Sequence, residues 1–201
     1  MRAGTPVHGA GFGPYTVLDL RALPEDGKGF ELEDGWLVEM APSPRHNWAL
    51  QNLAKSINLA AVATRSPVIV CQGEWEISTP AGVRKPDVFV IPREVARAAI
   101  LDDSPKVIPG RELLMVAEVI SPGSGSERTD LMRKVAEYAA LGIPQYWLVE
   151  HTPHLSVRVL RLDGTDYVPD PVVTEGSILE AEIQADKPFT VSLDPAHLLA
   201  L

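Results

Sequence analysis

Residues 113–120 read LLMVAEVI, and this stretch decides the fold class. Every residue but one is apolar, which is typical of a strand that is buried on both faces of a sheet. The exception is Glu118. Burying a carboxylate in such a strand is costly unless the group is paired, hydrogen-bonded or bound to a cation. The stretch therefore predicts both a central strand and a polar site near its carboxyl end.

A helix and a second buried strand follow this stretch. Residues 129–141 carry a helical pattern, with Thr129 as a candidate N-cap and Gly142 as a left-handed end. Residues 145–150 form the next apolar run. Strand–helix–strand connections are right-handed and join parallel strands. We therefore expect residues 113–120 and 145–150 to be parallel neighbours, with a site at their carboxyl ends.

The rest of the chain predicts an α/β fold. Asp34-Gly35 lies between two short alternating runs, which is typical of a β-hairpin. Together the elements predict a mixed β-sheet flanked by helices, with an N-terminal β-hairpin. Residues 1–14 are expected to be an arm, and residues 15–201 one domain. The remaining expected elements are a helix at 48–63, strands at 68–77, 87–91 and 155–162, and at 92–111 a loop with a turn or two of helix.

Composition narrows the class of protein. The 201 residues are 45% hydrophobic and 22% charged, as in an ordinary globular protein. No apolar run approaches the roughly 18 residues of a membrane span, and the start lacks a signal-peptide pattern, so we expect a cytoplasmic protein. The single cysteine, Cys71, lies in an apolar run and is expected to be buried.

The net charge of −9 argues against tight non-specific binding to nucleic acid. It does not exclude a nuclease, because carboxylates that bind a divalent metal add negative charge locally and the metal then contacts the phosphate. The charge therefore leaves both a metal-dependent nuclease and a non-catalytic protein open.

Asp87 is the second candidate carboxylate, because it opens the strand at 87–91 directly after a proline. Asp87 and Glu118, with a backbone carbonyl such as that of Val119, would give the all-oxygen coordination that Mg²⁺ or Mn²⁺ prefers. No Cys/His cluster has the ligand spacing of a zinc site. A metal held there would lower the pKa of a bound water.

A lysine is expected nearby. Asp130, Lys134 and Tyr138 recur every four residues, so they share one face of the predicted helix. A lysine beside the attacking water would stabilise charge and assist deprotonation of the water. The structural alternatives are a solvated Lys134 that makes a local contact, and an ion pair between Lys134 and Glu118. For Asp87 the alternative is a bond to a local N–H, and Tyr138 is expected in the core.

Accessory candidates keep two interpretations each. Glu39 either orients a ligand water or faces solvent at the edge of the hairpin. His46 either touches substrate phosphate or only lies in the first turn of its helix. Arg84 and Lys85 either meet a nucleic-acid backbone or form solvated surface.

The residues Pro86-Asp87 and then Glu118-Val119-Ile120 resemble the PD-(D/E)xK nuclease pattern, with Ile120 where that pattern has lysine. Over about residues 28–195 the sequence is similar to the Uma-two family of restriction endonucleases. The similar residues are Asp34-Gly35, Glu39, His46, Lys85-Pro86-Asp87, Glu118 to Pro122, Asp130, Lys134, Tyr138, Gly142-Ile143-Pro144 and Tyr146 to Val149.

The resemblance implies a restriction-endonuclease-like fold and metal-dependent cleavage of phosphodiester bonds, with DNA as the expected partner. In that family the missing lysine is thought to come from the following helix, which carries over onto Lys134. A homodimer would suit the cutting of both strands of a duplex. The alternative hypothesis is a non-catalytic module on the same fold that binds protein or nucleic acid.

Overall fold

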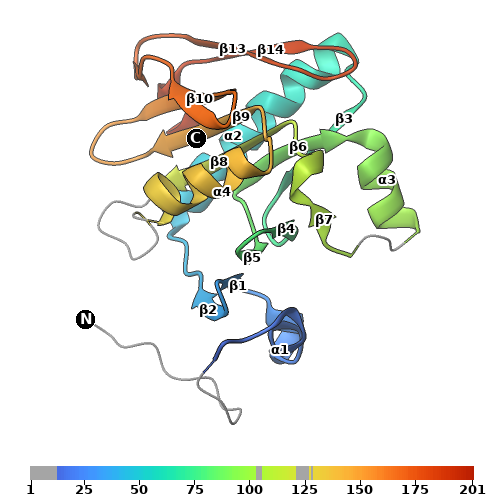
Figure 1. The fold of residues 1–201 in the computed structure, drawn as a ribbon. Helices are drawn as coiled ribbons and strands as arrows, with labels where there is room; N and C mark the ends of the chain where they lie inside the picture. Colours follow the sequence, from blue (N-terminus) through green and yellow to red (C-terminus); the bar gives the residue numbers. More distant parts are fainter. Residues whose placement is uncertain (1–12, 103–105, 121–126, 128) are drawn as a thin grey trace.

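The computed structural model describes residues 13–102, 106–120, 127 and 129–201 (Figure 1). Most of the predicted arm, residues 1–12, lies outside this part of the chain, as does the run from Ser121 to Ser126. None of the helices in the described residues combines the length and the apolar character needed to cross a bilayer. The helical segments are α1 (Val17–Arg21), η1 (Pro24–Gly27), α2 (Pro44–Thr64), α3 (Arg93–Leu101), η2 (Gly110–Glu112), η3 (Thr129–Arg133), α4 (Lys134–Ala140) and η4 (Pro195–Leu199).

A mixed sheet forms the centre of the molecule, in the order β11-β10-β9-β8-β6-β3. Its strands β8 and β9 are parallel neighbours and are joined through α4, as the sequence predicted. Strand β6 runs antiparallel to β8 on the other side. The strands are β3 (Val68–Gln72), β6 (Val88–Pro92), β8 (Met115–Ile120), β9 (Gln145–Glu150), β10 (Ser156–Asp163) and β11 (Asp166–Pro169), and β12 (Val173–Thr174) pairs with β10.

A smaller sheet, in the order β2-β1-β5-β4-β7, lies below the central one (Figure 1). Its β1–β2 hairpin is the predicted one. Asp34 and Gly35 have φ angles of 48° and 79°, as a two-residue turn of this kind requires at both positions. The strands are β1 (Phe30–Glu33), β2 (Trp36–Glu39), β4 (Ile77–Thr79), β5 (Gly82–Arg84) and β7 (Ile108–Pro109).

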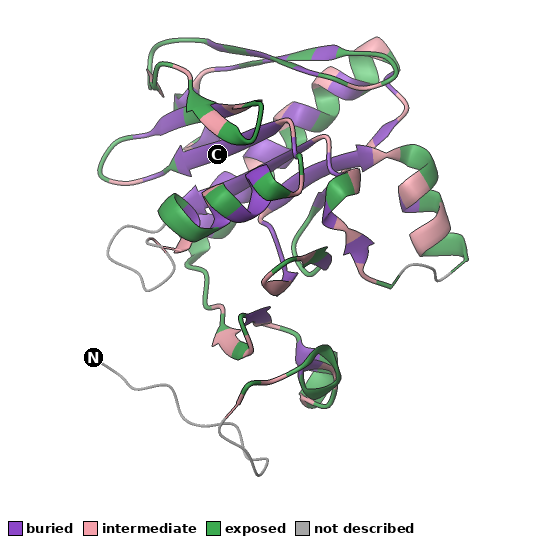
Figure 2. Cartoon of the chain, viewed as in Figure 1, coloured by how far each residue is buried: buried purple, intermediate pink, exposed green. Residues whose placement is uncertain are grey.

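Two layers cover the central sheet, whose strands β6, β8 and β9 are almost entirely buried (Figure 2). Helix α2 and the hairpin of β13 (Leu179–Ile183) and β14 (Phe189–Leu193) pack on one face, against Ala117 and Val119 of β8. Helices α3 and α4 pack on the other, against Val116 and Ile120. Because successive side chains of a strand alternate between faces, Glu118 points to the α4 side.

Three predicted elements differ from the structure. The first helix begins at Pro44 and not near residue 48, because Ser43 caps it and proline suits the first helical position. The strand expected at 68–77 breaks at Gly73, whose φ of 82° turns the chain so that β4 joins the smaller sheet. Residues 93–101 form a full helix, α3, where a loop with a turn or two was expected.

Cys71 is buried, as the sequence predicted, and burial raises the pKa of its thiol to about 12.

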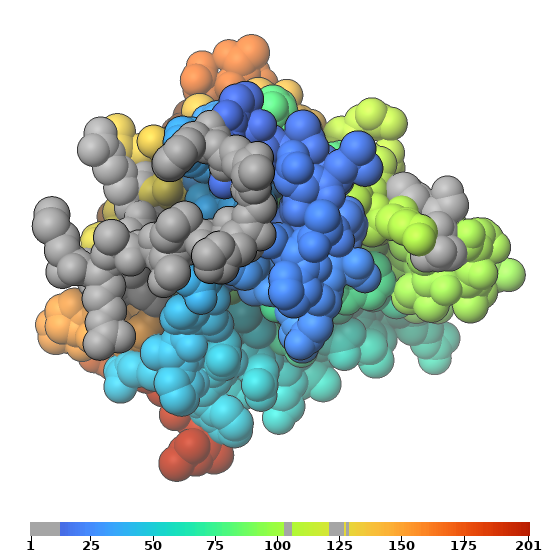
Figure 3. Space-filling model, turned by 90° about the horizontal axis from the view of Figure 1, so that it is seen from below, coloured from blue at the N-terminus to red at the C-terminus, as the bar shows by residue number. Residues whose placement is uncertain are grey.

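At the lower end of the molecule, α1 and the residues after it form much of the surface (Figure 3, blue). The smaller sheet therefore lies between this segment and the ends of β6 and β8, where the candidate site is found.

Candidate active site

Asp87 sits where the ladder between β6 and β8 stops. The last paired residues are Val88 and Ala117, so the backbone of Val119 on this side has no partner in β6. The Asp87 carboxylate takes this place: its Oδ2 accepts the Val119 N–H at 2.7 Å and lies 3.0 Å from Nε2 of His46. Both contacts involve Oδ2. The other oxygen, Oδ1, has no bond from a described residue.

Glu118 is held in the same one-sided way. Its side chain is 5% exposed, and its Oε1 accepts hydrogen bonds from Nζ of Lys134 and the hydroxyl of Tyr138, both at 2.9 Å. No described residue bonds to its Oε2. Asp87 and Glu118 therefore each have one oxygen fixed by protein donors and one oxygen to which no described residue bonds.

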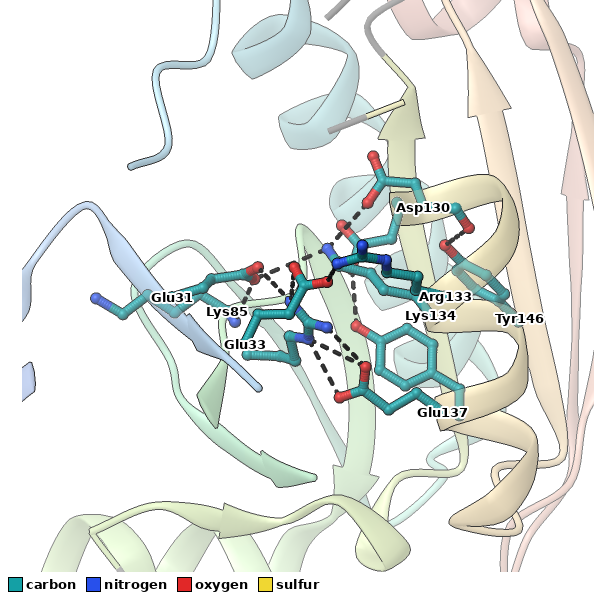
Figure 4. Close-up of polar contacts among 11 residues, drawn as sticks. Glu31, Glu33, Lys85, Asp130, Arg133, Lys134, Glu137 and Tyr146 are labelled. Atoms are coloured by element: carbon teal, nitrogen blue, oxygen red, sulfur yellow. Dashed lines mark hydrogen bonds and ion pairs between the residues drawn. The ribbon is translucent and has the colours of Figure 1, made fainter. Parts of the chain in front are cut away.

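Lys134 is buried and contacts carboxylates from three elements (Figure 4). Its Nζ lies 2.9 Å from Glu118, 3.0 Å from Asp130 Oδ1 and 3.7 Å from Glu31 Oε1. The contact with Asp130 is an ion pair whose angles do not suit a hydrogen bond, which leaves that buried oxygen without one. The predicted i,i+4 contact thus exists, but the predicted alternative of a solvated lysine is wrong.

The buried charges shift one another. Burial raises the pKa of Glu118 well above its usual value, and the nearby Asp87 and Asp130 add to this, while Lys134 acts in the opposite direction. The pKa of Asp130 is raised for the same reasons. Burial alone would lower the pKa of Lys134, but Glu118 and Glu31 raise it well above normal. Lys134 is therefore charged at neutral pH, and it does not balance all of the surrounding carboxylates.

A π-helical turn, η3, brings Asp130 and Lys134 to the site. Thr129 is the first residue of this turn, where a capping residue of a regular helix was expected. The Tyr146 hydroxyl donates a hydrogen bond to the Asp130 carbonyl at 2.9 Å. Tyr146 packs edge-on against Tyr138, with ring centroids 5.1 Å apart. Tyr138 is therefore a core residue, as expected, and also a hydrogen-bond donor to the site.

The smaller sheet contributes Glu31 and Glu33, which the sequence did not single out, and their partner Arg84. Arg84 is fully buried and bonds to Glu137 at 2.7 Å, Glu33 at 2.9 Å and Glu31 at 3.4 Å. Burial by itself would lower the pKa of Arg84, but these carboxylates raise it. Arg133 of the π turn also pairs with Glu33. Glu31 connects this network to Lys134.

Lys85 is also buried. Its N–H donates to Glu31 at 2.8 Å, and its Nζ bonds to the Gly27 carbonyl at 2.9 Å and to Glu74 at 2.8 Å. The interpretation of Arg84 and Lys85 as solvated surface or as nucleic-acid contacts is therefore wrong. No sequence signal marked their buried partners Glu31 and Glu33, because these acids alternate with apolar residues as solvent-facing acids do.

The two accessory candidates, His46 and Glu39, differ in where the structure places them. His46 is buried beside Asp87; burial lowers the pKa of His46, but the bond to Asp87 outweighs it and raises the pKa. Glu39 is exposed at the end of β2 and bonds to no described side chain. His151, which the sequence analysis missed, packs edge-on against His46 with centroids 6.2 Å apart.

Within the described residues, no three His, Cys, Asp or Glu side chains are arranged to hold a metal ion by themselves. Asp87 and Glu118 thus form a pair of carboxylates, and further ligands would have to be backbone, water or substrate. The candidate site brings together residues from segments that are far apart in the chain: Asp87, Glu118, Lys134, Asp130 and His46.

Comparisons with known proteins identify the family. The sequence model of the Uma2 family, described as "Putative restriction endonuclease", matches residues 17–191. The chain belongs to the Uma2 family. The family expected from the sequence is therefore confirmed. No curated protein gives a significant match.

A solved structure supports the fold. It is a crystal structure from Anabaena variabilis ATCC 29413, described as "a putative nuclease belonging to DUF820". It superposes with a TM-score of 0.67 at 16% sequence identity, and the match covers 92% of this chain and 97% of that one. The likeness confirms the predicted α/β fold.

Proposed function

We propose that this Uma2 chain is a metal-dependent nuclease that hydrolyses phosphodiester bonds, with DNA as substrate. The observation that carries the proposal is the one-sided bonding of Asp87 and Glu118. Each carboxylate is oriented through one oxygen by protein donors, and no described residue bonds to the other oxygen. Outer partners that orient metal ligands in this way are typical of metal sites.

The donor set fits a hard divalent cation such as Mg²⁺ or Mn²⁺. These ions prefer oxygen ligands, and Mg²⁺ is commonly held by one or two carboxylates, with water and substrate phosphate as the other ligands. The Val119 carbonyl is a third candidate donor. In a strand, the N–H and C=O of one residue point to the same neighbour, so this carbonyl faces the side on which Asp87 receives the Val119 N–H.

A divalent cation bound there would polarise a phosphoryl oxygen and lower the pKa of the attacking water. Lys134 would stabilise the negative charge that develops at the phosphorus centre. Because its pKa is raised, Lys134 assists deprotonation of the water through its positive charge and does not accept the proton itself. Asp130 and Glu31 keep the ammonium in place, and His46 and Tyr138 orient the two carboxylates.

The assignment of DNA as the substrate rests on the family description, which names a restriction endonuclease. The net charge of −9 favours a protein that engages nucleic acid through its site and not through a broad basic face. A homodimer and a cytoplasmic location remain predictions from the sequence.

The test is cleavage of supercoiled, duplex, single-stranded and branched DNA, and of RNA, with Mg²⁺ or Mn²⁺. We expect DNA cleavage by the wild type, and its loss in Asp87→Asn and Glu118→Gln. The matched control is Glu180→Gln, an exposed carboxylate on the distant β13, which should cut normally. If no substrate is cut with either metal, or if both site variants cut like the control, the nuclease proposal is wrong and the non-catalytic module replaces it.

A further inference from the structure

The ammonium of Lys134 occupies the position of a counter-ion. Lys134 is 4% exposed, and its ammonium contacts Glu118 of β8, Asp130 of the π turn and Glu31 of β1. Burying a lysine without partners would be costly, and burying these acids without a cation would be costly too. The ammonium and the carboxylates therefore stabilise each other in the metal-free protein.

The balance of charge at this point is still negative. Three carboxylates, those of Glu118, Asp130 and Glu31, lie within 3.7 Å of this one ammonium. Arg84 is shared with Glu31 alone among the three, and its shortest bonds go to Glu137 and Glu33. The excess negative charge favours a further cation. That cation and Lys134 would, however, repel each other, because both would be bound to Glu118.

We propose that Lys134 is the resident counter-cation of the metal-free site and sets how tightly a divalent cation binds. The cation takes over the charge of Glu118 at its available oxygen. Lys134 is then released from Glu118. It stays bound to Asp130 and Glu31 and faces the phosphate of the substrate. This inference rests on the proposed function, because it assigns the cation to the same pair of carboxylates.

The experiment compares the wild type with Lys134→Met, which keeps the length of the side chain and removes its charge. Lys55→Met is the matched control, because Lys55 is an exposed lysine of α2. Two quantities are measured without substrate: the melting temperature in the absence of metal, and the Kd for Mn²⁺ by isothermal titration. Cleavage of DNA is measured separately.

We expect metal-free Lys134→Met to melt at a lower temperature than the wild type, and Mn²⁺ to raise its melting temperature by more. We also expect Lys134→Met to bind Mn²⁺ at least about tenfold more tightly, because the repulsion between the ammonium and the metal is gone. The same variant should cut DNA poorly. A catalytic lysine without the counter-ion role would lower cleavage but would not tighten metal binding.

Equal or weaker Mn²⁺ binding by Lys134→Met, compared with the wild type, would overturn the inference. If Lys134→Met does not fold without metal, refolding is followed by circular dichroism as Mn²⁺ is added; recovery supports the inference and a lack of recovery overturns it. Tighter binding without cleavage by the wild type would leave the inference standing and contradict the nuclease proposal. An absence of Mn²⁺ binding in both proteins would overturn the inference, while the cleavage assay would still decide the nuclease proposal.

Discussion

Replacing Arg84 by methionine should destabilise the protein strongly while keeping the side chain's length. Arg84 is fully buried, and its guanidinium bonds to Glu137 at 2.7 Å and to Glu33 at 2.9 Å, with Glu31 at 3.4 Å. Removing one partner of a buried ion pair costs about 3–5 kcal/mol, because the other charge remains buried and unpaired. Since three carboxylates share this one arginine, we expect a loss near the upper end of that range.

Urea unfolding followed by tryptophan fluorescence measures this loss, since Trp147 is fully buried in the central sheet. The matched control is Arg158→Met, in which an exposed arginine of β10 is changed. The control should alter the free energy of unfolding by less than about 0.5 kcal/mol. A loss below about 1 kcal/mol in Arg84→Met, as for an exposed ion pair, would refute the reasoning that this network joins the smaller sheet to α4.

Three further outcomes follow from single contacts. Tyr138→Phe should weaken Mn²⁺ binding or activity by about 10–100-fold, the usual effect of losing an outer partner of a metal ligand; unchanged titration and cleavage would contradict this. His46→Gln should have an effect of the same size through Asp87, which the same two assays would show; wild-type values in both would count against it. For Glu33, burial raises the pKa, but the bonds to Arg84 and Arg133 outweigh burial and lower it. The contribution of Glu33 to stability is therefore complete above pH 4.5, its ordinary pKa, and is lost as the pH falls through the lowered pKa of the folded protein. Glu33→Gln should therefore flatten the fall of the melting temperature below pH 4.5, and an unchanged profile would contradict the assignment.

The central part of the fold was predictable because its signals are local. The apolar run of β8 fixed a buried strand, and the ends of the following helix fixed a crossover to β9. The Asp34-Gly35 turn fixed the hairpin for the same reason. Strand β3 was predicted too long, because Gly73 alone does not show that the chain leaves one sheet for another.

The core of the candidate site was also predictable, since Asp87 and Glu118 are carboxylates in apolar strands and Lys134 lies on one helix face with Asp130. Glu31 and Glu33 were not. In sequence they alternate with apolar residues as solvent-facing acids do, and their partner Arg84 is more than fifty residues away. Only tertiary packing shows that these acids are buried.

The pair of orienting contacts on each carboxylate depends on geometry in the same way. His46 meets Asp87 because the beginning of α2 lies beside the start of β6, and Tyr138 reaches Glu118 because the π turn rotates α4. A helical repeat of four residues places Lys134 and Tyr138 on one face, but it does not show which oxygen of Glu118 they bind.

The most direct test of the metal site is isothermal titration of Mn²⁺ into the wild type, Asp87→Asn, Glu118→Gln and the control Glu180→Gln, with and without a short DNA duplex. The account predicts a saturable site in the wild type and the control, tighter with DNA because phosphate completes the coordination, and no site in the other two. Equal Mn²⁺ binding by all four proteins, or none by the wild type even with DNA, would contradict it.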